Sequence, residues 1–260
     1  MNARQSPGRT VTSKVMAILS TFESGPSTRT LTQIAEAADL PLPTAFRLVN
    51  ELVEWGALDK DESGTYLVGM RLWEVAQNAG RQLRDTARPF LQDLFSLTQE
   101  TSHLAIRDGH EALYIDRIYS SKRVPRASRV GGRLPLHATA VGKVLLAFEE
   151  PWVREAYIAR DLETPTQYTH VNKTRLVGEL ATIRQQGYAT TSEEVRAGSC
   201  SIAVPVLLTP EQAGAAIGLV MLSSQAQQMT RYLPPLRGIA RRIAPALRRR
   251  PLTGTNLTSI

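Results

Sequence analysis

Cysteine is almost absent from the sequence: Cys200 is the only one among 260 residues. A single thiol excludes an intramolecular disulfide and any cluster of cysteine metal ligands. The four histidines are scattered along the chain and show none of the spacings typical of metal sites. The sequence therefore predicts a protein that uses no metal and no cofactor.

Long hydrophobic runs are also missing, although 42% of the residues are hydrophobic and can supply a core. No run approaches the roughly 20 apolar residues that a membrane-spanning helix needs. The first residues, MNARQSPGRTVTS, contain no apolar stretch of signal-peptide length. We therefore expect a cytoplasmic protein without a membrane partner.

Basic residues are in excess, with a formal net charge of +7, but they are unevenly distributed. Residues 1–80 contain 7 Lys and Arg against 9 Asp and Glu, so the excess lies entirely in the rest of the chain. A net positive charge is typical of proteins that bind nucleic acid. Here the local pattern of residues must support it, because the net charge of the N-terminal segment does not.

The N-terminal 69 residues carry three helix patterns and a hairpin pattern. An apolar stripe at helical spacing predicts a first helix over residues 11–22. Thr30 and Gln33 match a capping box, which predicts the start of a second helix. A turn at residues 39–41 follows, and Pro43 suits the first position of a third helix. Two short strands, residues 57–60 and 65–68, are predicted to form a hairpin.

Three helices and a hairpin predict a winged helix-turn-helix. In this motif the second and third predicted helices form the helix-turn-helix, and the later of the two enters the major groove. Ala45, Leu48, Val49 and Leu52 are expected to face inward, which leaves a polar and cationic side outside. The residues predicted to contact DNA are Thr32, Pro43, Thr44, Phe46, Arg47 and Asn50. The alternative is a plain helical hairpin whose exposed threonine and arginine are merely solvated.

The remainder of the chain predicts an α+β domain. A helix should run from Met70 to about Leu83, and an apolar stripe resumes after Pro89. Strands are expected at residues 103–107, 112–118, 188–191, 201–207 and 215–222. Helices are expected at residues 139–148 and 173–186, the latter capped by Gly187, and from Met229 to Leu247. The predicted domains are residues 1–69, a linker helix at 70–88, an α+β domain at 89–250 and a disordered tail at 251–260.

Three features of the second domain allow alternative interpretations. Six cations without an intervening acid, Arg117, Lys122, Arg123, Arg126, Arg129 and Arg133, indicate a solvated loop, a second nucleic-acid surface or a subunit contact. Cys200 with a remote histidine could form a nucleophile pair, but a lone cysteine beside a strand is more often inert. Glu193 and Glu194, placed on a strand, would point to opposite faces, which argues against joint acid–base work. We expect no enzyme.

A helix predicted to begin at Thr139 indicates an anion site. The backbone N–H groups of its first turn, around Ala140 and Val141, have no partner within the helix and suit a carboxylate. The helix dipole favours the same charge. The alternative is a loop that simply crosses the sheet edge, with Thr139 as its cap.

Three segments in order resemble the IclR family of bacterial transcription regulators. They are LTQIAEAADLPLPTAFRLVNELVEWGAL, GGRLPLHATAVGKVLLA and GYATTSEEVRAGSCSIAVPV, and the resemblance covers roughly residues 10–248. It implies a DNA-binding N-terminal domain, a GAF-like effector-binding C-terminal domain, and dimers that often pair into tetramers.

The resemblance also implies an effector pocket. Its residues would be Thr139, Ala140, Val141, Thr191, Ser201, Gly218 and Val220. Many relatives carry Asp-Asp where this chain has Thr191 and Ser192. A relative that binds a small oxo-acid has serines at the positions of Gly218 and Val220. The pocket is thus expected to be less polar, with space at Gly218, and to suit a medium-sized or aromatic acid.

The sequence therefore predicts an operator-binding transcription regulator that responds to a small organic acid, of the carboxylic or aromatic class. The alternative is a DNA-binding protein without small-molecule control. Specific recognition by such a domain generally needs two half-sites in the DNA operator that are related by a two-fold axis, and this implies that the protein is a dimer or tetramer. Leu72, Val75, Ala76 and Ala79 are the expected dimer seam.

Overall fold

The computed structural model describes residues 9–23, 26–78, 81–125 and 127–248. The chain divides into two compact units, Met1–Ala79 and Gly80–Ile260, which are described separately below. The predicted disordered tail, residues 251–260, lies outside the described residues.

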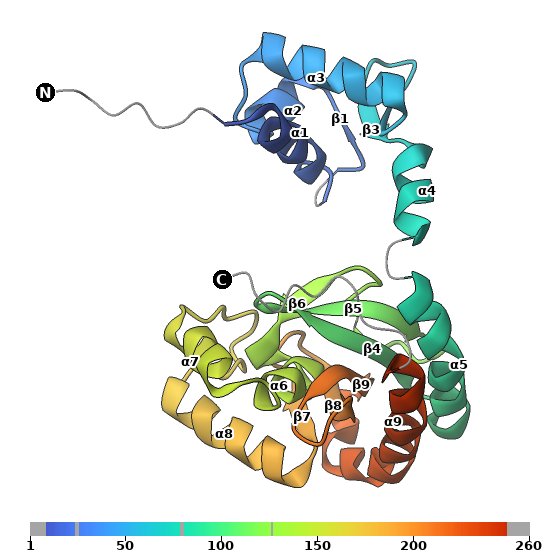
Figure 1. Ribbon diagram of the computed structural model, residues 1–260, viewed down its shortest axis with the longest axis vertical. Coiled ribbons are helices and arrows are strands. Elements are labelled where there is room, and N and C mark those ends of the chain that lie inside the picture. Colours follow the sequence, from blue (N-terminus) through green and yellow to red (C-terminus); the bar gives the residue numbers. More distant parts are fainter. Residues whose placement is uncertain (1–8, 24–25, 79–80, 126, 249–260) are drawn as a thin grey trace, which may run out of the picture. The chain divides into compact units, whose positions relative to one another are not determined.

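The first unit contains four helices and three short strands among its described residues (Figure 1). In chain order they are α1 (Val11–Ser20), β1 (Thr28–Arg29), α2 (Leu31–Ala37), α3 (Leu42–Trp55), β2 (Leu58–Lys60), β3 (Tyr66–Val68) and α4 (Met70–Asn78). The strands form an antiparallel sheet in the order β1-β3-β2. The core combines Ile18, Ile34, Leu48, Leu58 and Tyr66, so one apolar cluster joins α1, α2, α3 and the hairpin.

The predicted winged helix-turn-helix is confirmed, together with its capping box and its wing hairpin. Gln33 N–H donates to Thr30 Oγ1 at 3.3 Å and Thr30 N–H donates to Gln33 Oε1 at 2.9 Å, which completes the capping box. The wing turn is held by Asp61, which accepts from the backbone N–H and the hydroxyl of Thr65. Hydrogen bonds from the Thr65 and Ser63 side chains lower the pKa of Asp61 to about 2.

Two predictions for this unit need correction. Helix α3 begins at Leu42, one residue before the predicted start, with Pro41 as its N-cap. Pro43 still lies in the first turn, where its missing N–H has no partner to lose. Strand β1 was not predicted, because its two residues are too short to show an alternating pattern.

The second unit is a six-stranded antiparallel sheet between two layers of helices. Its strands are β4 (Thr101–Asp108), β5 (Glu111–Ile118), β6 (Arg133–Pro135), β7 (Ala189–Ser192), β8 (Ser199–Leu207) and β9 (Ala213–Leu222), in the order β6-β5-β4-β9-β8-β7. Its helices are α5 (Arg81–Thr98), α6 (Ala140–Ala147), α7 (Pro151–Ala159), α8 (Lys173–Gln186) and α9 (Leu233–Arg248), with short 3₁₀ segments at Leu136–Ala138 and Ser223–Tyr232.

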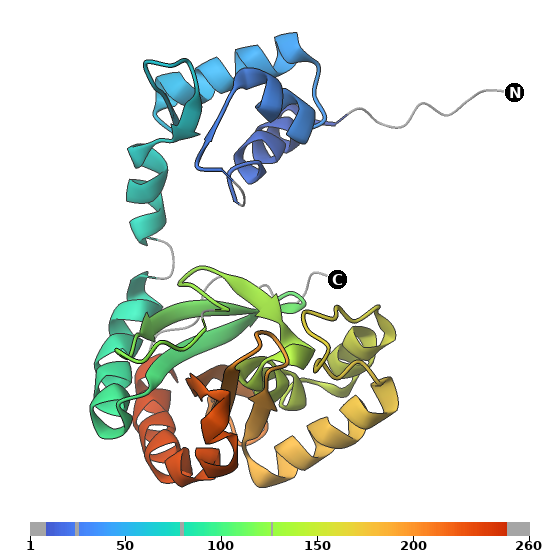
Figure 2. The ribbon, with the colours of Figure 1, turned by 180° about the vertical axis from the view of Figure 1, so that it is seen from behind.

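Each face of this sheet has its own apolar core. Helices α5 and α9 cover one face, through residues such as Leu91, Leu94 and Ile243. Helices α6 and α8 cover the other face, through residues such as Val144 and Leu180. Figures 1 and 2 show these two layers from opposite sides. The predicted α+β class is therefore confirmed, and α6 is placed with its first residue directly above the sheet.

Three elements of this unit differ from the sequence predictions. Strand β6 and helix α7 were not predicted; both are short, and β6 contains only Arg133–Pro135. The last helix begins at Leu233, not at Met229, which lies in a 3₁₀ segment. Pro234 and Pro235 explain this start, since proline fits the first turn of a helix. The predicted helix from Met70 to Leu83 crosses residues 79–80, which lie outside the described residues.

Candidate functional site

Helix α3 separates its residues into a buried side and an exposed side. Ala45, Leu48 and Val49 are fully buried. Among the predicted DNA contacts, Pro43, Phe46, Arg47 and Asn50 on α3 and Thr32 on α2 are exposed, and Thr44 is half-buried. The second helix of the pair therefore presents a continuous outer side to solvent.

Phe46 and Arg47 give this outer side its chemistry. The Phe46 side chain is 51% exposed, although burial is favoured for an aromatic ring. Arg47 forms an ion pair with Glu51 at 2.8 Å, and both side chains are more than half exposed. Such an exposed pair is worth only about 0.3–0.5 kcal/mol, so the guanidinium is readily available to another acceptor.

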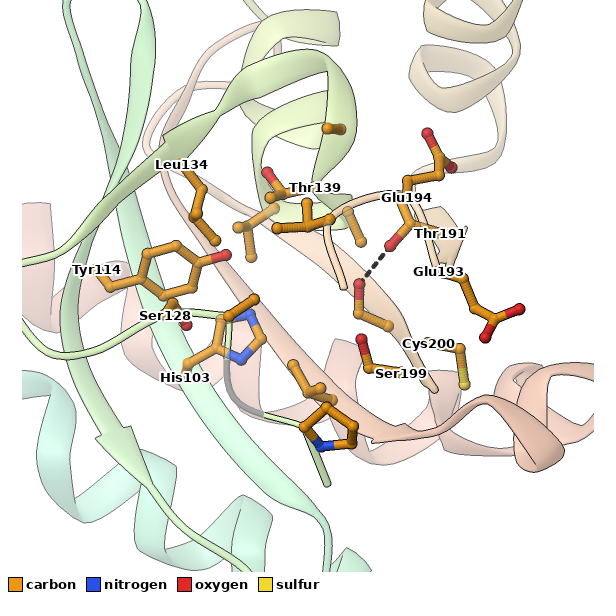
Figure 3. Close-up of a pocket in the computed structure, with 18 of the residues that line it drawn as sticks. His103, Tyr114, Ser128, Leu134, Thr139, Thr191, Glu193, Glu194, Ser199 and Cys200 are labelled. Atoms are coloured by element: carbon orange, nitrogen blue, oxygen red, sulfur yellow. Dashed lines mark hydrogen bonds between the residues drawn. The ribbon is translucent and has the colours of Figure 1, made fainter. Parts of the chain in front are cut away.

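A small cavity of about 40 Å³ lies in the second unit, between the start of α6 and the strands beneath it (Figure 3). Its wall includes six of the seven residues predicted for the effector pocket, namely Thr139, Ala140, Val141, Thr191, Ser201 and Val220. The structure thus brings together residues that are up to 81 positions apart, Thr139 and Val220, around one space.

The start of α6 presents backbone donors to this cavity. Thr139 is the N-cap, and its hydroxyl accepts from Gly142 N–H at 3.0 Å. Within the described residues, no acceptor is found for the N–H groups of Ala140 and Val141. A Cβ at Gly142 would lie 2.4 Å from Leu136 O, so only glycine allows the helix to approach the preceding turn so closely.

The opposite side of the cavity carries a pair of hydroxyl groups. Thr191 on β7 and Ser201 on β8 are register partners, and their hydroxyl oxygens are 2.5 Å apart. Figure 3 shows this pair between the start of α6 and Cys200. Because one hydroxyl donates to the other, the pair keeps one proton and several lone pairs for a third group.

Gly218 is the seventh predicted pocket residue, and the space expected there does not exist. Gly218 pairs with His103 across β9 and β4. A Cβ added at Gly218 would lie 2.9 Å from His103 Nε2 and 3.0 Å from Ile202 O. The space above this glycine is therefore filled by the imidazole, and Gly218 is not part of the cavity wall.

Several polar residues of the wall were not predicted as site residues, and three of them lie on the central strands: His103 on β4, and Tyr114 and Arg117 on β5. All three are at most 5% exposed. Burial, assisted by the charge of Arg117, lowers the pKa of His103 to about 3, and burial raises the pKa of Tyr114 to about 12. His103 and Tyr114 are therefore uncharged near neutral pH. The sequence contained one signal that could have revealed such residues: a polar side chain at a position of a predicted strand that should face inward.

The run of six cations is neither one solvated loop nor one exposed basic surface. Arg117 is buried and donates to both the carbonyl and the hydroxyl oxygen of Ser128. Lys122 pairs with Glu100, and Arg133 pairs with Asp108 at 2.6 Å. Three of the six charges are thus used within the unit, while Arg126 lies outside the described residues.

A buried ion-pair cluster adjoins the cavity. Lys143 on α6 is fully buried, and its Nζ lies 2.7 Å from Glu179 Oε1 and 3.0 Å from both oxygens of Glu194. Burial raises the pKa of Glu194, whereas the charge of Lys143 lowers it. Glu193 and Glu194 follow β7 and do not lie on it, so the prediction that they alternate across a strand is wrong. Glu193 instead accepts from Gly198 N–H at 2.7 Å.

The structure gives no support to a nucleophilic cysteine. Cys200 is 2% exposed, and its thiol lies 3.1 Å from Leu222 O. Burial and the charge of Glu100 raise the pKa of the thiol to about 11, so it stays protonated at neutral pH. In the described ranges, no group of three or more His, Cys, Asp and Glu side chains could hold a metal ion. None of the described helices combines the length and apolarity required to cross a bilayer.

Comparison with known proteins gives matches for both units. The family model for the IclR helix-turn-helix domain matches residues 11–62. The model for the C-terminal domain of the bacterial transcriptional regulator IclR matches residues 76–245. The HTH-type transcriptional regulator XynR of Escherichia coli is 35% identical over 220 residues, which cover 82% of this chain and 86% of XynR. KipR of Bacillus subtilis, also an HTH-type transcriptional regulator, is 30% identical over 83% of this chain and 86% of its own.

Solved structures show the same similarity. An IclR homolog from Microbacterium hydrocarbonoxydans, complexed with 4-hydroxybenzoate, has 30% sequence identity and a TM-score of 0.84; the match covers 92% of this chain and 100% of that one. The IclR of Thermotoga maritima has 28% identity and a TM-score of 0.74, with coverage of 90% and 97%.

Proposed function

The chain belongs to the IclR family of bacterial transcriptional regulators. From this premise we propose that a small organic acid, bound in the cavity at the start of α6, controls the binding of the protein to its operator. The family and the winged helix-turn-helix make it a DNA-binding transcriptional regulator. The effector, its site and the assembly of the subunits are the parts that we propose.

The start of α6 carries this proposal. The N–H groups of Ala140 and Val141 have no acceptor in the described part of the chain, and both residues line the cavity. Most residues of its wall are uncharged, the exceptions being Arg117, Glu193 and Glu194. Two free N–H groups at the positive end of a helix favour a carboxylate. The uncharged wall favours an apolar body, because unpaired polar groups are costly to bury. The relative complexed with 4-hydroxybenzoate supports an aromatic acid.

The cavity must widen to admit such a ligand. Its volume of about 40 Å³ is far below the roughly 150 Å³ of a cavity that binds benzene. Pro125, Ala127 and Ser128 line it from a segment between β5 and β6 whose described residues form no helix or strand. This segment has fewer backbone bonds to lose than the strands do, so we propose that it moves when the acid enters.

The proposal for DNA assigns roles to the outer side of α3. Arg47 reads a base edge, and Phe46 contacts a thymine methyl group. Thr32, Thr44 and Asn50 contact phosphate or base edges, and Pro43 places the first turn in the groove. Residues 1–69 then bind DNA, and α4 links the units and joins two copies. The effector domain was predicted to begin at residue 89, but it includes all of α5, because Ala87 packs in the core of the second unit.

A thermal-shift screen of organic acids tests effector control, since a ligand that binds only the folded state raises its melting temperature. Benzoate and its hydroxylated derivatives are the first probes. Ala140→Pro removes one of the two donors and suits the first helical position, because Thr139 before it is already extended at φ −118° and ψ 144°. Ala140→Gly is the matched control, because it keeps the N–H.

We expect a positive shift in the wild type and the Gly variant, and a smaller shift in the Pro variant. The melting temperature without acid shows whether each variant folds. The absence of any shift across the panel would instead favour a DNA-binding protein without small-molecule control by these acids.

A further inference from the structure

His103 has a polar atom that the protein leaves without a partner. Its side chain is 2% exposed and lines the cavity. Nδ1 of the ring is fully buried and has no hydrogen-bond partner among the described residues. Three hydroxyl groups of the wall do have partners: the Thr139 hydroxyl accepts from Gly142 N–H, and the Thr191 and Ser201 hydroxyls bond each other. A buried polar atom without a partner is destabilising, so an apolar ring would serve the fold better here.

The position of the imidazole is fixed by its neighbours. The ring occupies the space above Gly218, which any Cβ at that position would invade. On its other side the ring lies against Tyr114, with ring centroids 5.3 Å apart and planes tilted by 49°. Figure 3 shows His103 and Tyr114 on one wall, away from the Thr191 and Ser201 pair. A ring held on two sides presents its nitrogens in a defined direction, which is what selective recognition requires.

The charge state of His103 determines what it recognises. Burial and the positive charge of Arg117 lower its pKa to about 3, so the ring is neutral under physiological conditions. A neutral imidazole offers one donor and one acceptor. A hydroxyl group can either donate to the acceptor nitrogen or accept from the ring N–H, whereas a carboxylate can only accept. The carboxylate already has the two N–H groups of Ala140 and Val141.

We propose that His103 is the specificity-determining residue of the cavity and hydrogen-bonds a hydroxyl group on the ring of an aromatic acid. The carboxylate of that acid binds at the start of α6. This inference rests on the proposed function of the cavity and narrows its ligand class to hydroxylated aromatic acids.

The test compares ligand pairs that differ by one hydroxyl group. Isothermal titration of the full chain measures the affinities of benzoate and of 2-, 3- and 4-hydroxybenzoate. We expect at least one hydroxylated isomer to bind the wild type about 10-fold more tightly than benzoate, because it satisfies the buried imidazole. In His103→Phe, which keeps the ring shape and removes both nitrogens, that ratio should fall to about 1.

Two further variants keep the test decisive if His103→Phe does not fold. His103→Asn keeps a donor and an acceptor and should retain part of the preference. Gly218→Ala touches no ligand but displaces the imidazole by its Cβ, and should also reduce the ratio. His110→Phe is the matched control and should retain the wild-type ratio, because this histidine is exposed and lies outside the cavity wall.

The outcomes separate the two claims. If no acid binds the wild type, the proposed function fails and this inference fails with it. If acids bind but the ratio is unchanged in both His103→Phe and His103→Asn, the cavity binds acids and the role of His103 is refuted. A ratio that falls to about 1 in His103→Phe, stays intermediate in His103→Asn and persists in His110→Phe supports the inference.

Discussion

Lys143 and His103 are both buried beside the cavity, but they differ in the polar partners that the protein gives them. Lys143 is matched by three carboxylate oxygens from Glu179 and Glu194. His103 Nδ1 has no hydrogen-bond partner among the described residues. A satisfied buried charge stabilises a unique packing arrangement, whereas an unsatisfied neutral group is available to a ligand. Because of this contrast, we assign Lys143 a role in stabilising the fold and His103 a role in binding the ligand.

The buried His103 also predicts a pH dependence of stability. Its pKa is about 3 in the folded state and 6.5 in the unfolded state, so below pH 6.5 only the unfolded state takes up this proton. Stability is therefore lost as the pH falls. From pH 7 to pH 5 the loss attributable to His103 is about 2 kcal/mol.

Urea unfolding at each pH measures this effect. His103→Phe should lose less free energy of unfolding than the wild type over the same interval. The pKa values of His110, His137 and His170 are lowered as well, mainly by burial, and they contribute equally to both proteins. Parallel curves for the two proteins would show that His103 titrates normally.

Arg47 provides a prediction for DNA recognition. If it reads a base edge, Arg47→Ala should weaken operator binding by about 1–3 kcal/mol and relax the sequence preference. Lys14→Ala is the comparison, because a phosphate contact should weaken binding to all sequences alike and reduce the salt dependence. Fluorescence anisotropy with operator and scrambled duplexes gives both quantities. Wild-type affinity and preference in Arg47→Ala would mean that α3 is not oriented as proposed.

Single residues differ in how well the sequence reveals them. The exposed side of α3 follows from helical spacing alone, because each buried residue fixes where its neighbours point. His103 and Gly218 do not follow, because their contact depends on the register of β4 against β9. The sequence indicated space at Gly218, and the neighbouring strand fills it. Residue roles that depend on cross-strand pairing therefore required the structure.

At the scale of elements, the capping box of α2 predicts a specific stability change. Thr30→Ala removes the acceptor of Gln33 N–H and should destabilise the first unit by about 1 kcal/mol. Thr32→Ala is the matched control, because this threonine is exposed on the same helix. Chemical denaturation of both variants measures the difference. Equal stability of the two variants would contradict the structural role of the cap.

Elements that carry their own end signals were predicted well. Helix α8 has Asn172 as N-cap and Gly187 in the left-handed conformation as C-cap, and its predicted range matches the structure. Helix α7 begins with a proline, Pro151, but has no side-chain cap at its N-terminus, and strand β6 has only three residues. Their positions depend on neighbours that are distant in sequence: β6 exists only as the partner of β5. Residues near the ends of a helix or strand thus specify where it begins and ends. The position of a short element is determined instead by its contacts with residues that are distant in sequence.

At the scale of the whole molecule, we expect a dimer or a tetramer formed in part through α4. Val75 on this helix is 53% exposed, and Met70 is 62% exposed. Leu72 is half-buried, Ala76 belongs to the same helix, and Ala79 lies outside the described residues. Exposed apolar side chains on one helix are typical of a subunit contact.

Val75→Glu should therefore weaken self-association. Val177→Glu is a matched control, because Val177 on α8 is also 53% exposed. Light scattering at micromolar concentration should show a smaller species for Val75→Glu and a wild-type species for Val177→Glu. A monomeric wild type, with or without DNA, would refute the assembly altogether.

The central claim is that an organic acid bound in the second unit changes DNA binding by the first. The most direct test is the anisotropy of a labelled operator duplex, selected from random DNA by the wild type, titrated with protein at zero and at saturating acid. Coupling of about 1–3 kcal/mol predicts a change in operator affinity of about 5- to 150-fold. The same acid should have little effect on Ala140→Pro. An operator affinity that stays constant while the acid is bound would contradict the account.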